Sequence, residues 1–403
     1  MNTFEELGLN RDILESIKRQ GIETPTLIQE KSMPHVLKGK DVIGESATGS
    51  GKTLAFGAGI AENVQPGKGL QALVLTPTRE LAEQVTGSLK TLSGKRLKIM
   101  SVYGGVSINN QIDHMPRADV VVATPGRFLD HMERGTVDLS RISILVLDEA
   151  DRMLDMGFIE DVEKIIMECP KQRQTLFFSA TISREISDLS SRYMRDPVQV
   201  HAQNQVDPSK MKQVYYDVTR GLKLSLLAHL LKKKSEGLSM VFCNTRRSTE
   251  FVEKTLKSNR VNAIAIHGGQ SQNKRLKMIS MFNSAKVGVL ICTDVAARGL
   301  HIENVSHVYN FDIPNDPKDY VHRIGRTARA GEEGKVVNLL CQNDYDNFSR
   351  ILDEYTFEID NLPKPYIDRI DVNQSRQTQN RQRQGSGGRR QRRPNWNRGP
   401  VGC

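Results

Sequence analysis

The feature that most constrains this 403-residue chain is a repeated pattern of short, continuous apolar runs, each followed by a polar loop and a helix-like stretch. The runs are rich in β-branched residues and too short for helices. A strand that is apolar without alternation is buried on both faces, which is typical of a parallel sheet covered by helices. The runs lie at 72–75, 119–123, 143–147 and 175–178 in the first half, and at 239–243, 263–266, 287–292 and 306–311 in the second. The pattern predicts two tandem α/β domains with parallel sheets.

Polar residues follow directly after several of these runs. They are Thr76-Pro77-Thr78-Arg79, Asp148-Glu149, Ser179-Ala180-Thr181 and Thr293-Asp294. Parallel sheets bind their ligands at the carboxyl ends of the strands. We therefore expect the functional sites at these strand ends.

The composition changes twice along the chain. The stretch around 201–212 has no apolar periodicity, and after about Pro365 the sequence becomes rich in Gln, Arg, Asn, Gly and Ser. A segment with so few apolar residues cannot bury enough surface to offset the entropy lost on ordering. We predict a first domain over 1–202, a linker over 203–212, a second domain over 213–365 and a disordered basic tail over 366–403.

The net charge of +10 is concentrated in the tail, where residues 371–403 contain eight arginines and one aspartate. Such a tail indicates a polyanionic partner or serves solubility. No run approaches the roughly 20 apolar residues of a membrane span, and the first residues do not resemble a signal peptide. The five cysteines are scattered, which argues against a zinc site and favours a reducing compartment. We expect a cytoplasmic protein with no membrane contact.

A glycine-rich segment lies between the apolar pair Val42-Ile43 and the helix-like stretch 53–60. Its residues are Ser46, Ala47, Thr48, Gly49, Ser50, Gly51, Lys52 and Thr53. Backbone N–H groups of such a loop converge on phosphates, the lysine adds a positive charge, and the threonine hydroxyl binds Mg²⁺. The first glycine of the strict pattern is replaced by Ser46. The plainer alternative is a glycine-rich turn before a surface lysine.

The acidic pair Asp148-Glu149 ends another apolar run, as a phosphate site with a metal requires. Asp148 would hold Mg²⁺ together with Thr53, and Glu149 would orient and deprotonate the attacking water. The alternative is a solvated acidic strand end of the kind common in α/β folds.

Asp148-Glu149-Ala150-Asp151 spell the DEAD box, and the chain resembles the DEAD-box ATP-dependent RNA helicases of superfamily 2 over about residues 4–330. The resemblance implies two RecA-like domains, ATP with Mg²⁺ as cofactors, and RNA as partner. The segment 21–29 is similar to the family's adenine motif, which implies that Phe4, Thr24 and Gln29 bind the base. Taken alone, Gln29 would be a helix surface residue and Phe4 a core residue.

Further motifs of the family appear in order. The resemblance implies that RNA phosphates contact Pro77, Thr78, Arg79, Gly104, Gly105, Thr124, Pro125, Gly126 and Arg127 in the first domain, and Thr245, Gln272, Arg275 and Thr293 in the second. It implies that Ser179 and Thr181 couple the ATP site to RNA through hydrogen bonds to Asp151, and that Arg298, His322 and Asp294 contribute to coupling or nucleotide binding. Each short motif taken singly could be an ordinary turn or helix cap.

The last motif contains Arg326 and Arg329, which the resemblance makes arginine fingers for the γ-phosphate. A basic, solvated helix face is the alternative. One position departs from the family, because His301 stands where an aspartate normally accepts a hydrogen bond from the ribose. A neutral histidine can still accept one, whereas imidazolium cannot; otherwise His301 points away and the contact is missing.

The sequence thus predicts a monomeric, RNA-stimulated ATPase that binds single-stranded RNA across both domains and opens short duplexes locally, with little sequence preference. Two alternatives stay open. The chain could be a P-loop motor that acts on DNA or protein, or an ATP-dependent RNA clamp or annealing chaperone with little unwinding.

Overall fold

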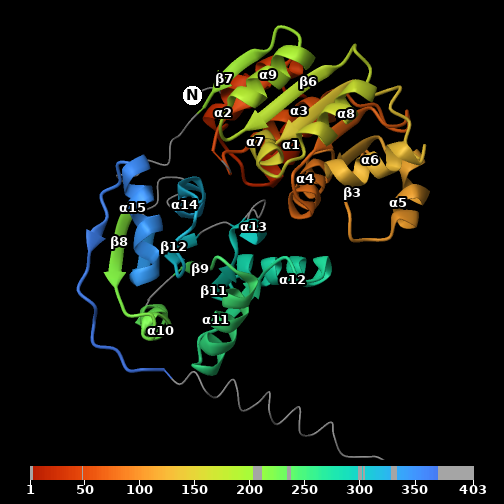
Figure 1. Ribbon diagram of the computed structural model, residues 1–403. Helices are drawn as coiled ribbons and strands as arrows, with labels where there is room; N and C mark the ends of the chain where they lie inside the picture. The colour runs from red at the N-terminus through yellow and green to blue at the C-terminus, as the bar shows by residue number, and fades with distance from the viewer. Residues whose placement is uncertain are drawn as a thin grey trace, which may run out of the picture.

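The computed structural model describes residues 3–47, 49–202, 211–233, 237–297, 302, 305–327 and 334–370. These residues form two lobes, each a seven-stranded parallel sheet covered by helices (Figure 1). We call residues 3–202 the first lobe and residues 211–370 the second lobe. The predicted fold of two tandem parallel α/β domains is confirmed. The predictions for Thr48, Arg298, His301, Arg329, linker residues 203–210 and tail residues 371–403 lie outside the described residues.

The sheet of the first lobe has the strand order β3-β4-β2-β5-β6-β1-β7. Its strands are β1 (Val42–Glu45), β2 (Ala72–Leu75), β3 (Ile99–Val102), β4 (Val120–Ala123), β5 (Ile144–Asp148), β6 (Gln174–Ser179) and β7 (Val198–His201). Its helices are α1 (Arg11–Arg19), α2 (Leu27–Leu37), α3 (Lys52–Asn63), α4 (Arg79–Leu92), α5 (Ile108–His114), η1 (Met115–Arg117), α6 (Pro125–Glu133), α7 (Ala150–Asp155), α8 (Ile159–Glu168) and α9 (Arg184–Tyr193).

The second lobe repeats this architecture with the strand order β10-β11-β9-β12-β13-β8-β14. Its strands are β8 (Met211–Asp217), β9 (Leu238–Phe242), β10 (Ala263–Ile266), β11 (Val289–Cys292), β12 (Val305–Asn310), β13 (Gly334–Leu340) and β14 (Asp360–Asn361). Its helices are α10 (Lys223–Lys233), α11 (Arg246–Ser258), α12 (Gln272–Asn283), α13 (Asp294–Ala297), α14 (Pro317–Ile324), η3 (Gln342–Asp344) and α15 (Tyr345–Glu354).

Hydrophobic cores lie on both faces of each sheet, which explains the continuous apolar runs. In β2, Val74 belongs to one core of the first lobe and Leu73 to the core on the opposite face. In β9, Met240 and Val241 are divided in the same way between the two cores of the second lobe. Because neighbouring residues of a strand point to opposite faces, both must be apolar when helices cover both faces.

Each of the eight predicted runs becomes a strand whose ends differ from the prediction by no more than two residues. The strands β3, β7, β8, β13 and β14 were not predicted. β3 and β7 lie at the edges of their sheet, and their partly exposed positions interrupt the apolar pattern. β8 contains the exposed residues Lys212 and Asp217 and the buried polar residue Gln213, and β13 carries the buried polar residue Asn338. Such strands lack the run of apolar residues from which the others were recognised.

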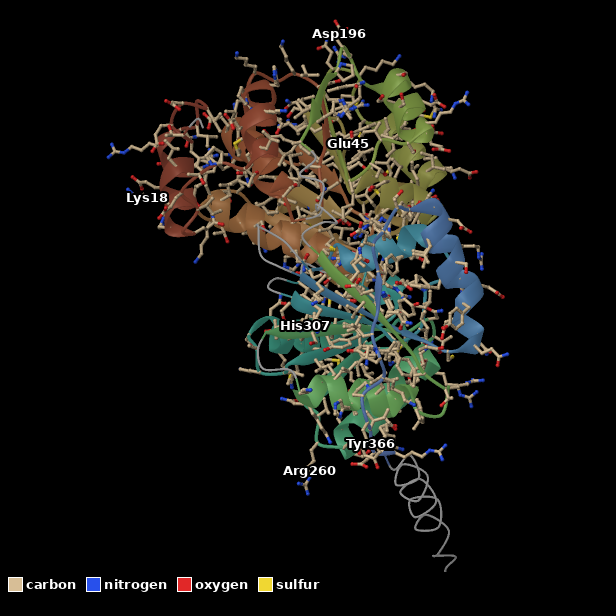
Figure 2. The ribbon with its side chains drawn as sticks, turned by 90° about the vertical axis from the view of Figure 1, so that its left-hand side faces the viewer. Lys18, Glu45, Asp196, Arg260, His307 and Tyr366 are labelled. Atoms are coloured by element: carbon tan, nitrogen blue, oxygen red, sulfur yellow. The ribbon has the colours of Figure 1, made fainter. Side chains whose placement is uncertain are left out.

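Two predicted boundaries need correction. Met211 and Lys212, placed in the linker, are the first residues of β8. The second lobe also continues past 365, because Ile367 and Ile370 pack against its core and the Ile370 amide donates to Ser225 Oγ at 3.1 Å. In Figure 1 this blue segment runs from α15 along β8 toward α10, and Figure 2 shows Tyr366 at the far end of the second lobe.

No helix in the described part of the chain is long and apolar enough to cross a membrane.

Candidate nucleotide site and nucleic-acid interface

The glycine-rich loop connects β1 to α3 in the first lobe, as the sequence predicts. Gly49 and Gly51 have φ values of 83° and 91°, in the left-handed region that favours glycine. The Gly51 carbonyl accepts a hydrogen bond of 3.0 Å from Gln29 Nε2, and a Cβ atom at Gly51 would overlap this amide. Glycine is therefore required at position 51 by both its backbone conformation and its neighbour.

Lys52 begins α3 and is 6% exposed. Its Nζ donates to the carbonyl oxygens of Ser46 at 2.7 Å and Ala47 at 3.3 Å. Burial lowers the pKa of Lys52, while the nearby carboxylates of Asp148 and Glu149 act in the opposite direction. The ammonium group thus lies inside the loop, next to the acidic pair.

Asp148 is the last residue of β5 and is 3% exposed. Its Oδ1 has no hydrogen-bond partner among the described residues. Burial, followed by the charge of Glu149, raises the pKa of Asp148 to about 7. An unpaired buried carboxylate is costly and is stabilised by a nearby cation. The donor set therefore fits Mg²⁺, an ion that prefers oxygen ligands; Thr53, half-buried in the first turn of α3, is the other predicted ligand.

Glu149 has an unusual backbone conformation for a residue that is not glycine, with φ 55° and ψ 50°. Such a conformation costs on the order of 1–3 kcal/mol, and such residues cluster at functional sites. Its Oε2 accepts a hydrogen bond of 2.7 Å from Arg152 Nη1, and both side chains are 7% exposed. Arg152 holds the Glu149 carboxylate in place and was not predicted, because nothing in the DEAD letters marks the following arginine.

The three predicted adenine residues have different environments. Gln29 is buried, and its amide oxygen accepts from the Thr26 N–H at 2.9 Å in a capping box of α2. The alternative that Gln29 is a helix surface residue is therefore wrong. Phe4 is 4% exposed within the core of the first lobe, as the core alternative expects, and Thr24 is exposed. Contact of these residues with adenine stays a prediction.

Asp151 connects the acidic motif to the loop after β6. Its Oδ2 accepts hydrogen bonds from the Ala180 and Thr181 backbone N–H groups, both at 3.1 Å, and from Thr181 Oγ1 at 3.3 Å. Its own N–H donates to Ser179 Oγ at 3.1 Å. The hydrogen bonds predicted between these two motifs are confirmed.

The predicted RNA-contacting residues of the first lobe follow the carboxyl ends of β2, β3 and β4, which are neighbours in the sheet. Thr78 accepts a hydrogen bond from the Leu81 N–H at 3.3 Å and so caps α4. The guanidinium group of Arg79 lies against Gly104 and Gly105, so that a side chain at Gly105 would overlap it. The loop after β4 contains Thr124. Pro125, Gly126 and Arg127 follow it as the first residues of α6.

The second lobe repeats this arrangement. Thr245 caps α11 by accepting from the Ser248 N–H at 3.0 Å, as Thr78 caps α4. The guanidinium group of Arg246 lies against Gly269, and a Cβ atom there would overlap it. Arg246 was not predicted as a site residue. The signal that could have revealed it is the recurrence of Thr-Arg and then Gly-Gly in both halves of the sequence.

Arg275 reaches from α12 to the first lobe. Its Nε lies 3.0 Å from Glu80 Oε1, as an ion pair rather than an aligned hydrogen bond, and the side chains are 14% and 4% exposed. Its Nη2 donates to the Ala296 carbonyl at 3.3 Å. Gln272, the other predicted residue of α12, is 8% exposed. The structure thus joins Arg275 to the first lobe through Glu80, a partner that was not predicted.

Arg323 connects three strand ends of the second lobe and is 1% exposed. It binds both carboxylate oxygens of Asp294, at 2.6 and 2.7 Å, and donates to Asn244 Oδ1 at 2.8 Å. It also donates to Asn310 Oδ1 and to the Asp312 carbonyl. Both carboxylate oxygens of Asp294, a predicted site residue, therefore bind Arg323. This pairing was not predicted from the sequence.

The remaining predicted residues of the second lobe lie near this group. Thr293 directly precedes α13 and is 8% exposed, and Arg326 follows α14 and is 3% exposed. The His322 Nδ1 lies 3.9 Å from Asp319 Oδ1, and the His322 side chain is about one-third exposed.

Comparison with known proteins gives matches to both lobes. The family model described as DEAD/DEAH box helicase matches residues 26–189, and the one described as helicase conserved C-terminal domain matches residues 222–331. The DEAD-box ATP-dependent RNA helicase CshA of Geobacillus kaustophilus is 44% identical over 356 residues, which are 87% of this chain and 76% of that protein.

Two structures of S. cerevisiae Dbp5 allow the arrangement of the lobes to be compared. Dbp5 bound to RNA and ADP BeF3 is 29% identical, covers 95% of this chain and 99% of its own, and has a TM-score of 0.81. A point variant of Dbp5 bound to Nup159, a Gle1 variant, IP6 and ADP is 27% identical, covers 93% and 99%, and has a TM-score of 0.63. From its motifs, fold and relatives, the chain belongs to the DEAD-box ATP-dependent RNA helicase family.

Proposed function

We propose that this protein is an RNA-stimulated ATPase that binds single-stranded RNA across both lobes and locally unwinds short duplexes. The observation that carries the proposal is the buried acidic pair beside the glycine-rich loop. Asp148 has an unpaired carboxylate oxygen, and Lys52 lies close enough for its charge to act on that carboxylate. Two acidic residues, a buried lysine and a loop of backbone amides are the parts that phosphoryl transfer needs.

In this proposal the first lobe binds ATP through its glycine-rich loop, with Lys52 contacting the phosphates. Mg²⁺, when bound by Asp148 and Thr53, would neutralise phosphate charge. Glu149, held by Arg152, orients and deprotonates the attacking water. Arg326 and Arg329 of the second lobe stabilise the charge that develops on the γ-phosphate, so that turnover requires both lobes.

RNA lies over the loops that follow β2, β3 and β4 in the first lobe and the loops that follow β9, β10 and β11 in the second. These loops offer arginines, threonine hydroxyls and backbone amides, which grip phosphates without reading base edges. The TM-score is higher to the Dbp5 structure with RNA and ADP BeF3 than to the one with ADP, which supports the present arrangement of the lobes as the RNA-binding form. We also propose that the protein acts as a monomer in the cytoplasm, where its four described cysteines, all free and buried, stay reduced.

A helicase assay with matched nucleic acids tests the proposal against its alternatives. We expect ATP to be hydrolysed faster with single-stranded RNA than with DNA of the same sequence, because a 2′-hydroxyl distinguishes them. A short RNA duplex should be separated only with hydrolysable ATP, and not by Lys52→Ala. Equal stimulation by DNA would favour the general P-loop motor. RNA-stimulated hydrolysis without strand separation would favour the clamp or annealing chaperone.

A further inference from the structure

A buried glutamine connects the loops that the proposed function assigns to RNA in the first lobe. Gln111 lies in α5 and is 6% exposed. Its Nε2 donates to the Tyr103 carbonyl at 3.1 Å, directly before the Gly104-Gly105 loop. Its Oε1 accepts from Arg127 Nη1 at 3.1 Å, and the same Nη1 donates to the Val106 carbonyl at 3.2 Å, directly after that loop. Gln111 and Arg127 therefore hold both ends of the Gly104-Gly105 loop.

A histidine fixes the orientation of this glutamine. His131 lies one helical turn after Arg127 in α6 and is fully buried. Its Nε2 lies 3.1 Å from Gln111 Oε1, and its Nδ1 lies 2.8 Å from Thr136 Oγ1. An amide oxygen can only accept, so His131 must carry a hydrogen on Nε2. The Gln111 oxygen then faces two donors, and its nitrogen can only point toward Tyr103.

We propose that Gln111 and His131 are positioning residues for RNA binding, which set the placement of Arg127 and of the Gly104-Gly105 loop relative to each other. The inference rests on the proposed function and deepens it. Neither side chain is at the surface, so neither can touch RNA itself. Their effect must pass through Arg127, whose side chain is 15% exposed, and through the backbone of the glycine loop.

The same network also has a purely structural interpretation. Buried amides are commonly bonded to carbonyl groups only to avoid the cost of an unsatisfied polar group. Gln174 is an example in the same lobe, because its Nε2 donates to the Val36 and Lys40 carbonyls at 2.9 and 2.7 Å. Gln174 begins β6, whereas the RNA loops follow the carboxyl ends of their strands. Gln174 is therefore a matched control for Gln111.

The experiment measures the RNA concentration that gives half-maximal ATPase for four variants of the full chain. Gln111→Leu removes all of the amide bonds, and His131→Phe removes the bond to Gln111 while keeping the ring volume. We expect each to raise the half-saturating RNA concentration roughly two- to tenfold, the effect of losing one hydrogen bond from Arg127 to RNA, with little change in the rate at saturating RNA. His131→Gln, whose amide can again donate to Gln111, should restore the wild-type value to within about twofold.

The salt dependence of RNA affinity provides a second measurement. If Arg127 no longer contacts a phosphate, the slope of log affinity against log salt should fall by about 0.7, the value for one contact to a single strand. Gln174→Leu should lower the melting temperature and leave both the half-saturating RNA concentration and the salt slope unchanged.

The possible outcomes separate the inference from the function on which it rests. Wild-type ATPase that does not respond to RNA contradicts both. A normal wild-type response, with Gln111→Leu and His131→Phe showing lower melting temperatures but unchanged RNA dependence, contradicts the inference alone. Failure of His131→Gln to recover RNA affinity in a folded protein also contradicts it, because the donor to Gln111 would then not matter.

Discussion

Glu149 shows at the scale of one residue how the fold prepares the proposed reaction. Its left-handed backbone turns the chain sharply between β5 and α7, and the buried ion pair with Arg152 fixes its carboxylate. The neighbouring Asp148 carboxylate has an unpaired oxygen and a raised pKa. The two adjacent carboxylates thus have different environments. That of Asp148 suits the proposed binding of a metal ion, and that of Glu149 suits the proposed orientation of the attacking water.

We predict that Glu149→Gln keeps ATP binding and loses turnover. The new amide oxygen can still accept from Arg152, so the fold should be retained, but an amide cannot take a proton from water. Loss of a general base typically costs about 10²–10⁴-fold in rate. Nucleotide titration and steady-state ATPase with RNA measure the two quantities.

The control for this variant is Glu163→Gln, at a carboxylate that pairs with Arg192 on the surface of the first lobe. It should leave both quantities unchanged. Turnover of Glu149→Gln within a few-fold of wild type would remove Glu149 from the assigned role.

At the scale of secondary structure, the starts of helices place many of the proposed site residues. Thr78 and Thr245 cap α4 and α11, so the arginine that follows each cap begins a helix next to a glycine pair. In α14, Arg323 binds groups at the carboxyl ends of β9, β11 and β12. Arg323 is therefore a structural centre of the second lobe.

We predict that Arg323→Lys destabilises the second lobe by about 1–3 kcal/mol, the cost of leaving buried acceptors without a donor. A lysine cannot bind both Asp294 oxygens and three further acceptors at once. Chemical denaturation followed by circular dichroism should show an earlier transition of this lobe. Arg350→Lys, at an exposed arginine of α15, should change stability by no more than about 0.5 kcal/mol. A similar small effect for Arg323→Lys would show that its bonds contribute little.

The sequence predicted the elements that carry strong local signals. Apolar runs revealed the strands with cores on both faces, and glycines, acidic residues and polar strand ends revealed the phosphate loop and its neighbours. It did not reveal Arg152, Gln111 or the contact between Glu80 and Arg275, because each depends on side chains that only the tertiary structure brings together. Gln29 illustrates the limit, since its place in a motif was clear but its bond to the Gly51 carbonyl was not.

At the scale of the whole molecule, the two lobes are joined by charge. Glu80 and Arg275 form a largely buried pair between α4 and α12. This pair connects two helices that begin next to the proposed RNA loops, so RNA binding and closure should be coupled.

A double-mutant cycle tests this coupling. We predict that Glu80→Gln and Arg275→Ala each weaken RNA stimulation of the ATPase, and that the double variant is no worse than the more severe single one. The coupling energy should lie in the range of about 0.5–3 kcal/mol that is usual for residues in contact. Glu163→Gln with Arg192→Ala, a pair within one lobe, should show none. Additive effects of the first pair would mean that this contact does not contribute to closure.

We expect the two lobes to form one ATPase site only when RNA is bound. The most direct test is the steady-state ATPase rate of wild type and Arg326→Ala at saturating ATP, with and without single-stranded RNA. We predict a low wild-type rate without RNA, a strong increase with RNA, and loss of that increase in Arg326→Ala while nucleotide binding is kept. A wild-type rate that is equally high without RNA, or an unchanged RNA response in Arg326→Ala, would contradict this expectation.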